Sequence, residues 1–332
     1  MRSRMKKVKY LCFVALLTFN AVLGSGCGTG GEKGHQENTI PVIVNNFDFN
    51  GNRIQIPISK MPERVIVARP EILELLLALG VREPICAVYL TKDYENRLSE
   101  WQKVLPHAKF YTHELDKETA LMRQPDFLLG WRMSFRNGAL GNVDFWQDRN
   151  IPTYIEENSG PVPAVDPFPP STVETEIRFI QNMGIIFQKE KEAQKLMDGI
   201  RQSLQDGLKK NQEQQAHQVI TIEFMRDKIE VFGDKLLSGD IIKKLGSHNI
   251  NYEIPFISRE EFRVCEADTI FIIYHGGKQE AANALQQLFV PEFSGIPAVK
   301  NKRVYLLPYR YVCASNVYTA QTIREIAEGL YE

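Results

Sequence analysis

The feature that most constrains the fold is a series of short apolar runs, separated by segments long enough to form a helix. The runs lie at residues 64–67, 85–88, 127–129 and 153–155 in the first half and at 219–224, 269–273 and 304–307 in the second. Continuous apolar runs with helical crossovers between them are typical of parallel sheets buried on both faces. We therefore predict an α/β fold with two lobes, each built on a parallel sheet.

One long amphipathic helix is predicted between the two series, over residues 189–212. Its apolar stripe recurs at steps of three and four residues and comprises Ala193, Leu196, Met197, Ile200, Leu204 and Leu208. At ~1.5 Å per residue the helix spans about 35 Å, the size of a small domain. We interpret it as a rigid connection between an N-terminal lobe at 42–188, which opens with a hairpin around Asn50-Gly51, and a C-terminal lobe at 213–332. The alternative is a surface helix of one domain.

The N-terminus has the pattern of an export signal. A basic leader precedes an apolar stretch at 10–23, small residues follow, and Cys27 comes next. The stretch is too short to span a bilayer, so residues 1–26 are predicted to be a signal peptide. The pattern resembles a bacterial lipobox, with Gly24 where an aliphatic residue is usual, and this implies lipidation of Cys27. We expect an exported protein anchored to the cell membrane through lipid, with a flexible tether at 27–41. An ordinary secretory signal is the alternative.

Composition and motifs exclude several functions. Removing residues 1–26 leaves 35 basic against 41 acidic residues, so nucleic acid is not an expected partner. Three cysteines remain, Cys86, Cys265 and Cys313, and an odd number allows at most one disulfide among them. The sequence has no GxSxG elbow, P-loop or GxGxxG motif after a strand, so we do not expect an enzyme. The six histidines are scattered without metal-ligand spacing, and no metal site is predicted.

Arginine and aromatic residues follow the predicted strands. Ligands bind beyond the carboxyl ends of strands in open parallel sheets, so these positions are expected to line a cleft between the lobes. The predicted ligand-binding residues are Arg69, Tyr89, Trp131, Arg132, Arg226, Tyr309, Arg310 and Tyr311. Guanidinium forks bind anionic oxygens, and aromatic rings cover flat apolar surface. The combination suits a bulky anionic complex, such as a ferric siderophore or a haem with its propionates.

Several segments in the same order resemble a known family, the class III binding proteins of ABC importers for iron-siderophores, haem and cobalamin. The segments include residues 61–67 (MPERVIV), 71–81 (EILELLLALGV), 124–130 (QPDFLLG), 150–154 (NIPTY), 183–187 (MGIIF), 257–262 (ISREEF) and 298–305 (AVKNKRVY). The resemblance implies two Rossmann-like lobes joined by a single long helix. It also implies capture of an iron chelate in the interlobe cleft, without a resident cofactor, and delivery to an ABC permease with its ATPase.

The resemblance further implies two acidic docking residues for the permease. Glu74 matches the position in the N-terminal lobe, and Asp240 matches it in the C-terminal lobe, where Glu is more common. Haem is an alternative ligand that the sequence does not separate from a siderophore, with Tyr89, Tyr309, Tyr311 or Met225 among the candidate axial ligands. Cobalamin is less favoured because four arginines suit more negative charge. A metal-ion-binding protein is a further alternative, in which His275 would lie near the cleft rim.

Overall fold

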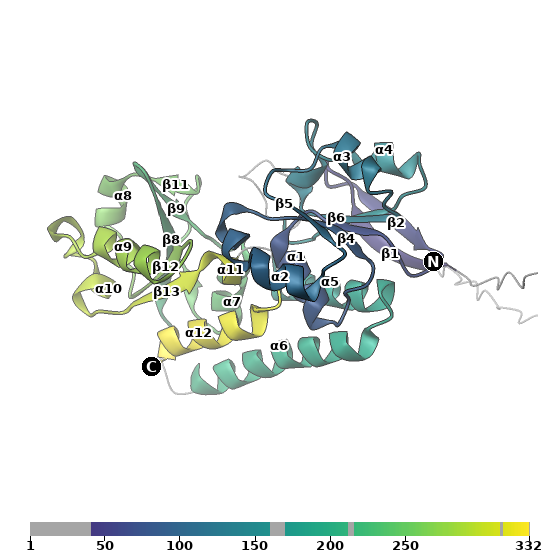
Figure 1. The fold of residues 1–332 in the computed structure, drawn as a ribbon. Coiled ribbons are helices and arrows are strands. Elements are labelled where there is room, and N and C mark those ends of the chain that lie inside the picture. The colour runs from purple at the N-terminus through teal and green to yellow at the C-terminus, as the bar shows by residue number, and fades with distance from the viewer. Residues whose placement is uncertain (1–40, 160–169, 212–215, 313–314, 332) are drawn as a thin grey trace, which may run out of the picture. The chain divides into compact units, whose positions relative to one another are not determined.

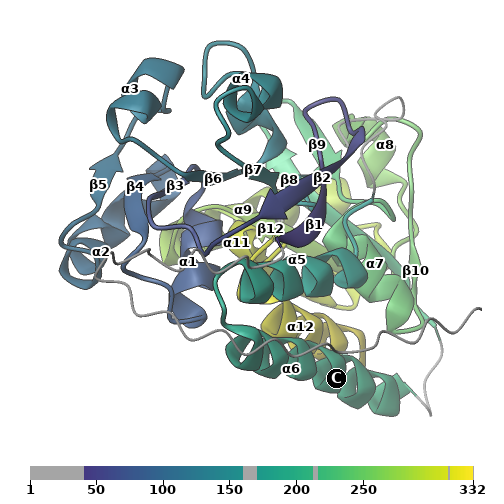
Figure 2. The same ribbon diagram turned by 90° about the vertical axis from the view of Figure 1, so that its right-hand side faces the viewer.

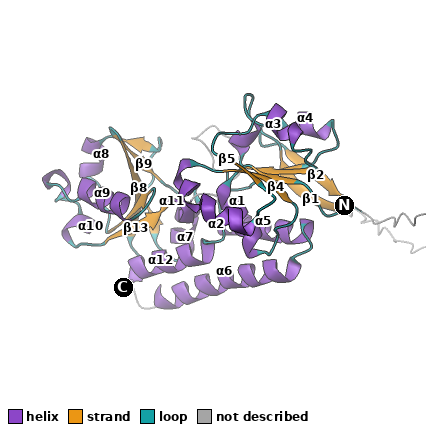
Figure 3. Cartoon of the chain, viewed as in Figure 1, coloured by secondary structure: helices purple, strands orange, loops and turns teal. Residues whose placement is uncertain are grey.

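The computed structural model describes residues 41–159, 170–211, 216–312 and 315–331. The predicted signal peptide, Cys27, Cys313 and the tether up to residue 40 lie outside these ranges. Within them no helix is long and apolar enough to cross a membrane. Figure 1 shows the chain, and Figure 3 shows its strands in separate groups, which belong to a five-stranded sheet, a six-stranded sheet and a two-stranded hairpin.

The five-stranded sheet is entirely parallel and has the order β5-β4-β3-β6-β7. Its strands are β3 (Val65–Val67), β4 (Ile85–Tyr89), β5 (Lys109–Tyr111), β6 (Phe127–Gly130) and β7 (Thr153–Ile155). Its helices are α1 (Pro70–Ala78), η1 (Lys92–Arg97), α2 (Leu98–Val104), α3 (Lys117–Met122), η2 (Arg132–Phe135) and α4 (Val143–Gln147). Four of the five strands match predicted apolar runs, and β5 was missed.

The predicted hairpin is present as β1 (Val42–Phe47) and β2 (Arg53–Ile58), which pair antiparallel. The turn contains Gly51 at φ 82°, in the left-handed region that glycine adopts without strain. The buried Asn46 amide donates to the Ile155 carbonyl at 2.7 Å, and the Ile155 backbone N–H donates back to Asn46 Oδ1 at 2.9 Å. These two hydrogen bonds fasten the hairpin to β7 at the edge of the sheet.

The six-stranded sheet is mixed, which differs from the purely parallel sheet that we expected. Its strands are β8 (Gln218–Met225), β9 (Lys228–Val231), β10 (His248–Asn249), β11 (Phe256–Ile257), β12 (Thr269–Tyr274) and β13 (Val304–Pro308). Strands β8, β12 and β13 are parallel, whereas β9 and β11 pair antiparallel. Its helices are α7 (Leu237–Lys244), α8 (Arg259–Arg263), α9 (Lys278–Leu288), η3 (Pro291–Phe293), α10 (Pro297–Lys300), α11 (Tyr309–Val312) and α12 (Thr319–Tyr331).

The long helix predicted over 189–212 is present as α6 (Glu190–Asn211). It packs against α5 (Val173–Ile186), which follows the first sheet, and against α12, which follows the second (Figure 2). Two glycines permit the close packing. A Cβ at Gly184 would lie 2.6 Å from Ala193 Cβ, and one at Gly207 would lie 2.5 Å from Leu245 Cδ2.

Both sheets are covered by apolar side chains on both faces. Alternate residues of one strand belong to different core clusters, as Val65 and Val67 face one cluster and Ile66 faces another. The largest cluster includes residues of both sheets together with α5, α6 and α12. The predicted class, two α/β sheets with one long helix, is confirmed, and burial on both faces explains why the strands are continuous apolar runs.

Candidate functional site

The carboxyl ends of neighbouring strands β3 and β6 bring three predicted residues together. Arg69 follows β3, Trp131 and Arg132 follow β6, and the two strands are paired in parallel. The Arg69 guanidinium carbon lies 4.6 Å from the centroid of the Trp131 ring, and Arg132 lies 6.0 Å from that of Phe49. Stacked guanidinium and aromatic groups are therefore concentrated at this edge, as the sequence predicted.

Arg69 is held by carboxylates as well as by the indole. It is only 8% exposed, and its Nε donates to Glu71 Oε2 at 3.1 Å. Glu156, which directly follows β7, lies 4.0 Å away through Oε1. These neighbours fix the position of Arg69, so the Trp131 ring that stacks on it also has a fixed orientation.

Glu156 is an unusual acid in the described part of the chain. It is fully buried, and neither carboxyl oxygen has a hydrogen-bond partner there. Burial raises the pKa of Glu156 to about 8, Arg69 opposes the rise, and Glu71 and Glu176 add to it. At neutral pH this carboxyl is therefore mostly protonated, and Glu71 is the charged partner of Arg69.

Tyr89, at the end of β4, belongs to the same edge. Burial raises the pKa of its hydroxyl, the Glu114 carboxylate raises it further, and Arg136 and Arg69 lower it. Arg136 and Glu114 form a two-pronged ion pair in which two guanidinium nitrogens donate to the two carboxylate oxygens. The phenol thus lies among paired charges rather than beside a free guanidinium.

The ends of β8, β12 and β13 form the matching edge of the second sheet. The register pairs Ile222 with Ile272 and Tyr274 with Pro308, so all three strands end on the same side. Tyr309 and Arg310 follow β13 there. Arg226 lies in the exposed β8–β9 turn, where no ion pair to it is found among the described residues.

A cavity of about 140 Å³ lies between residues that follow strands of the two sheets. The N-terminal half contributes Asp93, Tyr94, Asn96 and Arg97, and the C-terminal half contributes Tyr274, His275, Gly276, Gly277, Pro308, Tyr309 and Arg310. Two predicted residues, Tyr309 and Arg310, therefore line a cavity shared by both halves of the chain.

His275 connects the two sides of this cavity. Its Nδ1 lies 2.8 Å from Asp93 Oδ2 and its Nε2 lies 3.2 Å from Glu223 Oε1, while its ring stacks on Tyr309 with centroids 4.1 Å apart. The bond to Glu223 and that to Asp93 raise the pKa of His275 to about 9 against desolvation. The imidazole is thus protonated at neutral pH, between one carboxylate of each half.

Arg310 and Tyr311 pack with Tyr318 beside the cavity. The Tyr311 and Tyr318 rings stack with centroids 4.8 Å apart, and the Arg310 guanidinium lies 5.5 Å and 5.4 Å from them. Tyr311 is only 8% exposed. It is therefore buried behind Arg310, which differs from the ligand-facing position that we expected.

Glu74, the docking residue that the resemblance implies for the N-terminal lobe, is nearly buried. Glu74 is 7% exposed, and its Oε1 accepts from Arg97 Nη1 at 2.9 Å and from the Tyr318 hydroxyl at 3.0 Å. Burial raises the pKa of Glu74 against these partners. In this conformation the residue joins α1 to the segment before α12, so it does not present a free carboxylate to a permease.

Asp240 is also engaged within the protein. Its Oδ2 accepts from the Val173 backbone N–H at 2.9 Å, and Lys244 Nζ lies 3.4 Å from its Oδ1. The side chain is 13% exposed. Asp240 thus joins α7 to the start of α5, and little of it reaches the surface.

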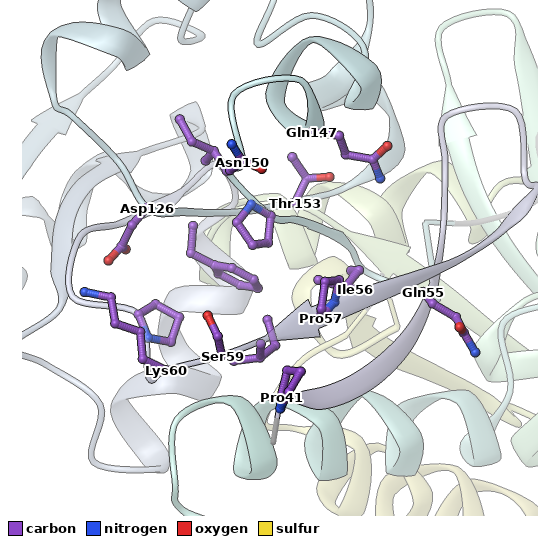
Figure 4. Close-up of a pocket in the computed structure, with 15 residues that line it drawn as sticks. Pro41, Gln55, Ile56, Pro57, Ser59, Lys60, Asp126, Gln147, Asn150 and Thr153 are labelled. Atoms are coloured by element: carbon purple, nitrogen blue, oxygen red, sulfur yellow. The ribbon is translucent and has the colours of Figure 1, made fainter. Parts of the chain in front are cut away.

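A second cavity, of about 650 Å³, lies at the opposite edge of the first sheet (Figure 4). It is lined by the hairpin strand β2, including Ile56 and Pro57, and by residues at the amino ends of β6 and β7, such as Asp126 and Thr153. Its lining is largely apolar and prolyl, without the stacked guanidinium groups of the carboxyl edges. We therefore place the candidate site at the carboxyl edges.

Metal-binding chemistry is not supported by the described residues. No group of three or more His, Cys, Asp or Glu side chains in them has the geometry to hold a metal ion. Cys86 and Cys265 are free thiols whose pKa is raised by burial, which disfavours the thiolate.

Sequence reasoning missed the acidic partners of the site. Asp93 and Glu223 give no local signal, because Asp93 lies in the short helix η1 after β4 and Glu223 lies within strand β8. His275 and Asp93 are 182 residues apart in the chain. The position of His275 after a strand end was the available signal, and only the fold brings its partners to it.

The comparisons with known proteins agree with this arrangement. A family model described as periplasmic binding protein matches residues 65–311. No curated protein matches. A periplasmic binding protein from Veillonella parvula DSM 2008 is 28% identical, with a TM-score of 0.75 over 88% of this chain and 92% of that chain.

Two more distant structures share the fold. The petrobactin-binding protein YclQ of Bacillus subtilis is 19% identical, with a TM-score of 0.63 over 88% of this chain and 99% of its own. S. aureus IsdE, solved in complex with heme, is 17% identical, with a TM-score of 0.58 over 81% of this chain and 99% of its own. Because the family model covers most of the sequence from β3 to α11, the chain belongs to the periplasmic binding protein family.

Proposed function

We propose that the chain is the substrate-binding lipoprotein of an ABC importer. It binds a ferric siderophore or a related iron chelate between the carboxyl edges of its two sheets and delivers the chelate to a permease with its ATPase. Membership of the periplasmic binding protein family supports an exported protein that binds solutes rather than an enzyme. Two proteins of the same fold, the petrobactin-binding YclQ and the heme complex of IsdE, agree with an iron complex as ligand.

The observation that carries the proposal is the pairing of guanidinium and aromatic groups at the ends of β3 and β6. Trp131 is partly exposed with Arg69 fixed behind it, and Tyr309 and Arg310 line the cavity on the other side. Flat apolar faces and guanidinium donors together match a bulky chelate that displays oxygen atoms around a metal. Parallel sheets bind ligands at this edge.

Trp131 offers a direct test. The other two tryptophans, Trp101 and Trp146, are 1% and 0% exposed, so a ligand at the carboxyl edges reaches Trp131 first. We expect a ferric siderophore to quench the fluorescence with a Kd of about 1 μM or below, corresponding to about 8 kcal/mol. The Trp131→Phe variant should retain its fold and lose most of the quenching.

The same titration distinguishes the alternatives. Haem is the second candidate, because Tyr309 and His275 lie side by side at the cavity and either is a possible axial ligand. A Soret shift that is lost in Tyr309→Phe would favour haem over a siderophore. Tight binding of cobalamin alone or of Zn²⁺ alone, with no response to any ferric complex, would contradict the proposal.

Membrane attachment through Cys27 is a separate part of the proposal. It rests on the sequence pattern at 1–27, and we expect Cys27→Ser to move the protein from the membrane fraction to the soluble exported fraction. A membrane-bound Cys27→Ser variant would contradict a lipid anchor at this residue. Glu74 and Asp240 keep their predicted association with permease docking only if the lobes rearrange to free their carboxylates.

A further inference from the structure

Arg69, at the first carboxyl edge, is already neutralised by a carboxylate of the protein. Arg69 is bonded to Glu71, and both side chains are nearly buried, at 9% and 3% exposed. A ligand oxygen that approached Arg69 would also approach the Glu71 carboxylate. The guanidinium therefore acts mainly as a positioned donor and stacking partner rather than as a net positive charge.

The exposed rim of the same edge has a second neutral pair. Arg136 and Glu114 are bonded through both prongs, with side chains 37% and 30% exposed. The pair lies close enough to Tyr89 for both charges to affect the pKa of that phenol. The charges that act on Tyr89 are those of Glu114, Arg136 and Arg69, and each of the two guanidinium groups is itself bonded to a carboxylate.

At the carboxyl edge of the second sheet, the positive charge of His275 is balanced by carboxylates on both sides of the ring. The His275 cation lies between Asp93 and Glu223, so one positive charge meets two negative ones. Glu230 is also near, since burial raises its pKa, the Glu223 charge raises it further and the His275 charge lowers it. The charged groups on this side of the cavity therefore do not add up to a net positive charge.

Two guanidinium groups line the cavity, those of Arg97 and Arg310, and Arg97 is paired with Glu74 at 2.9 Å and Glu100 at 2.8 Å. The Arg310 guanidinium lies over the faces of Tyr311 and Tyr318, and its charge opposes the rise in the pKa of Glu74 that burial causes. Arg226, in the exposed turn, is followed directly by Asp227. Neither residue gives the cavity the excess of positive charge that a highly charged anion needs.

We propose, resting on the proposed function, that the ligand is a ferric chelate of net charge near zero, of the tris-hydroxamate type, rather than a tris-catecholate. Three hydroxamate monoanions cancel the charge of Fe³⁺, whereas three catecholate dianions leave three negative charges. A trianion would lie against Glu71, Glu114, Asp93 and Glu223, and like-charge contacts of this kind cost several kcal/mol. A neutral hydroxamate complex needs only donors for its oxygens and rings for its apolar faces, which Arg69, Trp131 and Tyr309 supply.

The test compares two probes on the full chain purified in detergent. Ferrichrome represents the neutral tris-hydroxamates, and ferric enterobactin represents the tris-catecholate trianions. We expect ferrichrome to bind at least about tenfold more tightly, equivalent to about 1.4 kcal/mol. Its Kd should change less than about twofold between about 0.05 M and 0.5 M salt, because screening does not act on a neutral ligand.

The outcomes separate this inference from the proposed function. Ferric enterobactin binding as tightly as ferrichrome, or more tightly, would overturn the charge argument while leaving a ferric siderophore as ligand. If neither probe, nor ferrioxamine B as a second tris-hydroxamate, bound at all, the proposed function itself would fail.

A variant pair tests the role of the protein's own acids. Glu114→Gln removes the partner of Arg136 at the exposed rim, and we expect the ratio of ferric enterobactin to ferrichrome affinity to rise about fivefold. The control Glu190→Gln makes the same change of charge at an exposed position of α6 and should leave the ratio unchanged. An unchanged ratio in Glu114→Gln would show that compensation by the protein's carboxylates does not set the selectivity.

Discussion

The contact between the two halves at His275 allows the sharpest prediction, made with the His275→Gln variant. Glutamine retains hydrogen-bonding capacity but cannot carry the charge. In the wild type the imidazolium bonds to Asp93 at 2.8 Å and Glu223 at 3.2 Å and stacks on Tyr309. The variant therefore removes two charge-assisted contacts and one ring contact together.

The magnitude follows from the exposure of each contact. His275 and Asp93 are 39% and 43% exposed, so solvent reduces that pair to about 0.5 kcal/mol. Glu223 is 13% exposed, and its bond is worth about 1 kcal/mol. The stack on Tyr309 adds about 0.5 kcal/mol and does not require the proton. We expect His275→Gln to lower the free energy of unfolding by about 2 kcal/mol when the wild-type imidazole is charged.

The pH dependence has a definite sign. The pKa of His275 is raised from its ordinary value of 6.5 to about 9 in the folded protein. Below 6.5 both states carry the proton and the charged contacts contribute fully. Between 6.5 and 9 folding takes up a proton, so the contribution declines as the pH rises, and above 9 it is lost.

Urea denaturation of wild type and variant at about pH 6 and about pH 10 measures this difference. The loss of stability should fall from about 2 kcal/mol to about 0.5 kcal/mol, the part due to the ring contact. The control His248→Gln, at an exposed position of β10, should cost little at either pH. An equal loss for His275→Gln at both pH values would refute the view that a charged imidazole joins the two halves.

Three further substitutions test other features of the structure. Glu156→Gln should stabilise the protein by about 2 kcal/mol at about pH 9 and much less at about pH 5. The pKa of Glu156 is raised to about 8, so the wild-type protein loses stability as the pH rises from 4.5 through 8. Urea denaturation at the two pH values measures the difference, and a gain independent of pH would contradict a buried ionising carboxyl. Gly239→Ala should lower the free energy of unfolding by about 3 kcal/mol, because its Cβ would lie 2.2 Å from the Gly233 carbonyl oxygen. Gly199→Ala, which has open space and a helical backbone, should raise it by about 0.5 kcal/mol. Thermal denaturation compares the two variants, and the reverse order of stability would contradict this packing. Glu74→Ala should lower the free energy of unfolding by about 2 kcal/mol and reduce uptake only in proportion to the folded fraction; a loss of uptake at full stability would instead support a docking role.

The strands were predictable because of how they are buried. Residues Val65–Val67 of β3 are all 0% exposed, and because both faces of the strand are buried, every position is apolar and the sequence shows a continuous apolar run. Strand β5 lies at the sheet edge with an exposed Lys109 and a half-buried Phe110, so it has no continuous apolar run and was not predicted. Strands β9 and β11 add antiparallel pairs to the second sheet. Both strands are short and of mixed polarity, so the sequence did not predict them.

The site was predictable in position but not in charge. A residue after a strand end lies at the carboxyl edge whatever its neighbours are, so Arg69, Trp131 and Tyr309 could be placed from sequence. The partners that neutralise the charges come from distant segments, as Glu114 lies 22 residues before Arg136 and Asp93 lies 182 residues before His275. The burial of Glu74 could not be predicted, because its partners Arg97 and Tyr318 lie 23 and 244 residues away in the chain.

The 22 residues of α6 determine how far the two sheets can move apart. An extended hinge concentrates rotation in a few backbone dihedral angles, whereas a continuous helix distributes any flexure over every peptide and stores it elastically. With α5 and α12 packed along it, large excursions would break side-chain contacts on both flanks. We therefore expect the two carboxyl edges to keep a nearly constant separation, so that release of the proposed ligand depends on local side-chain rearrangement rather than on rotation of one half.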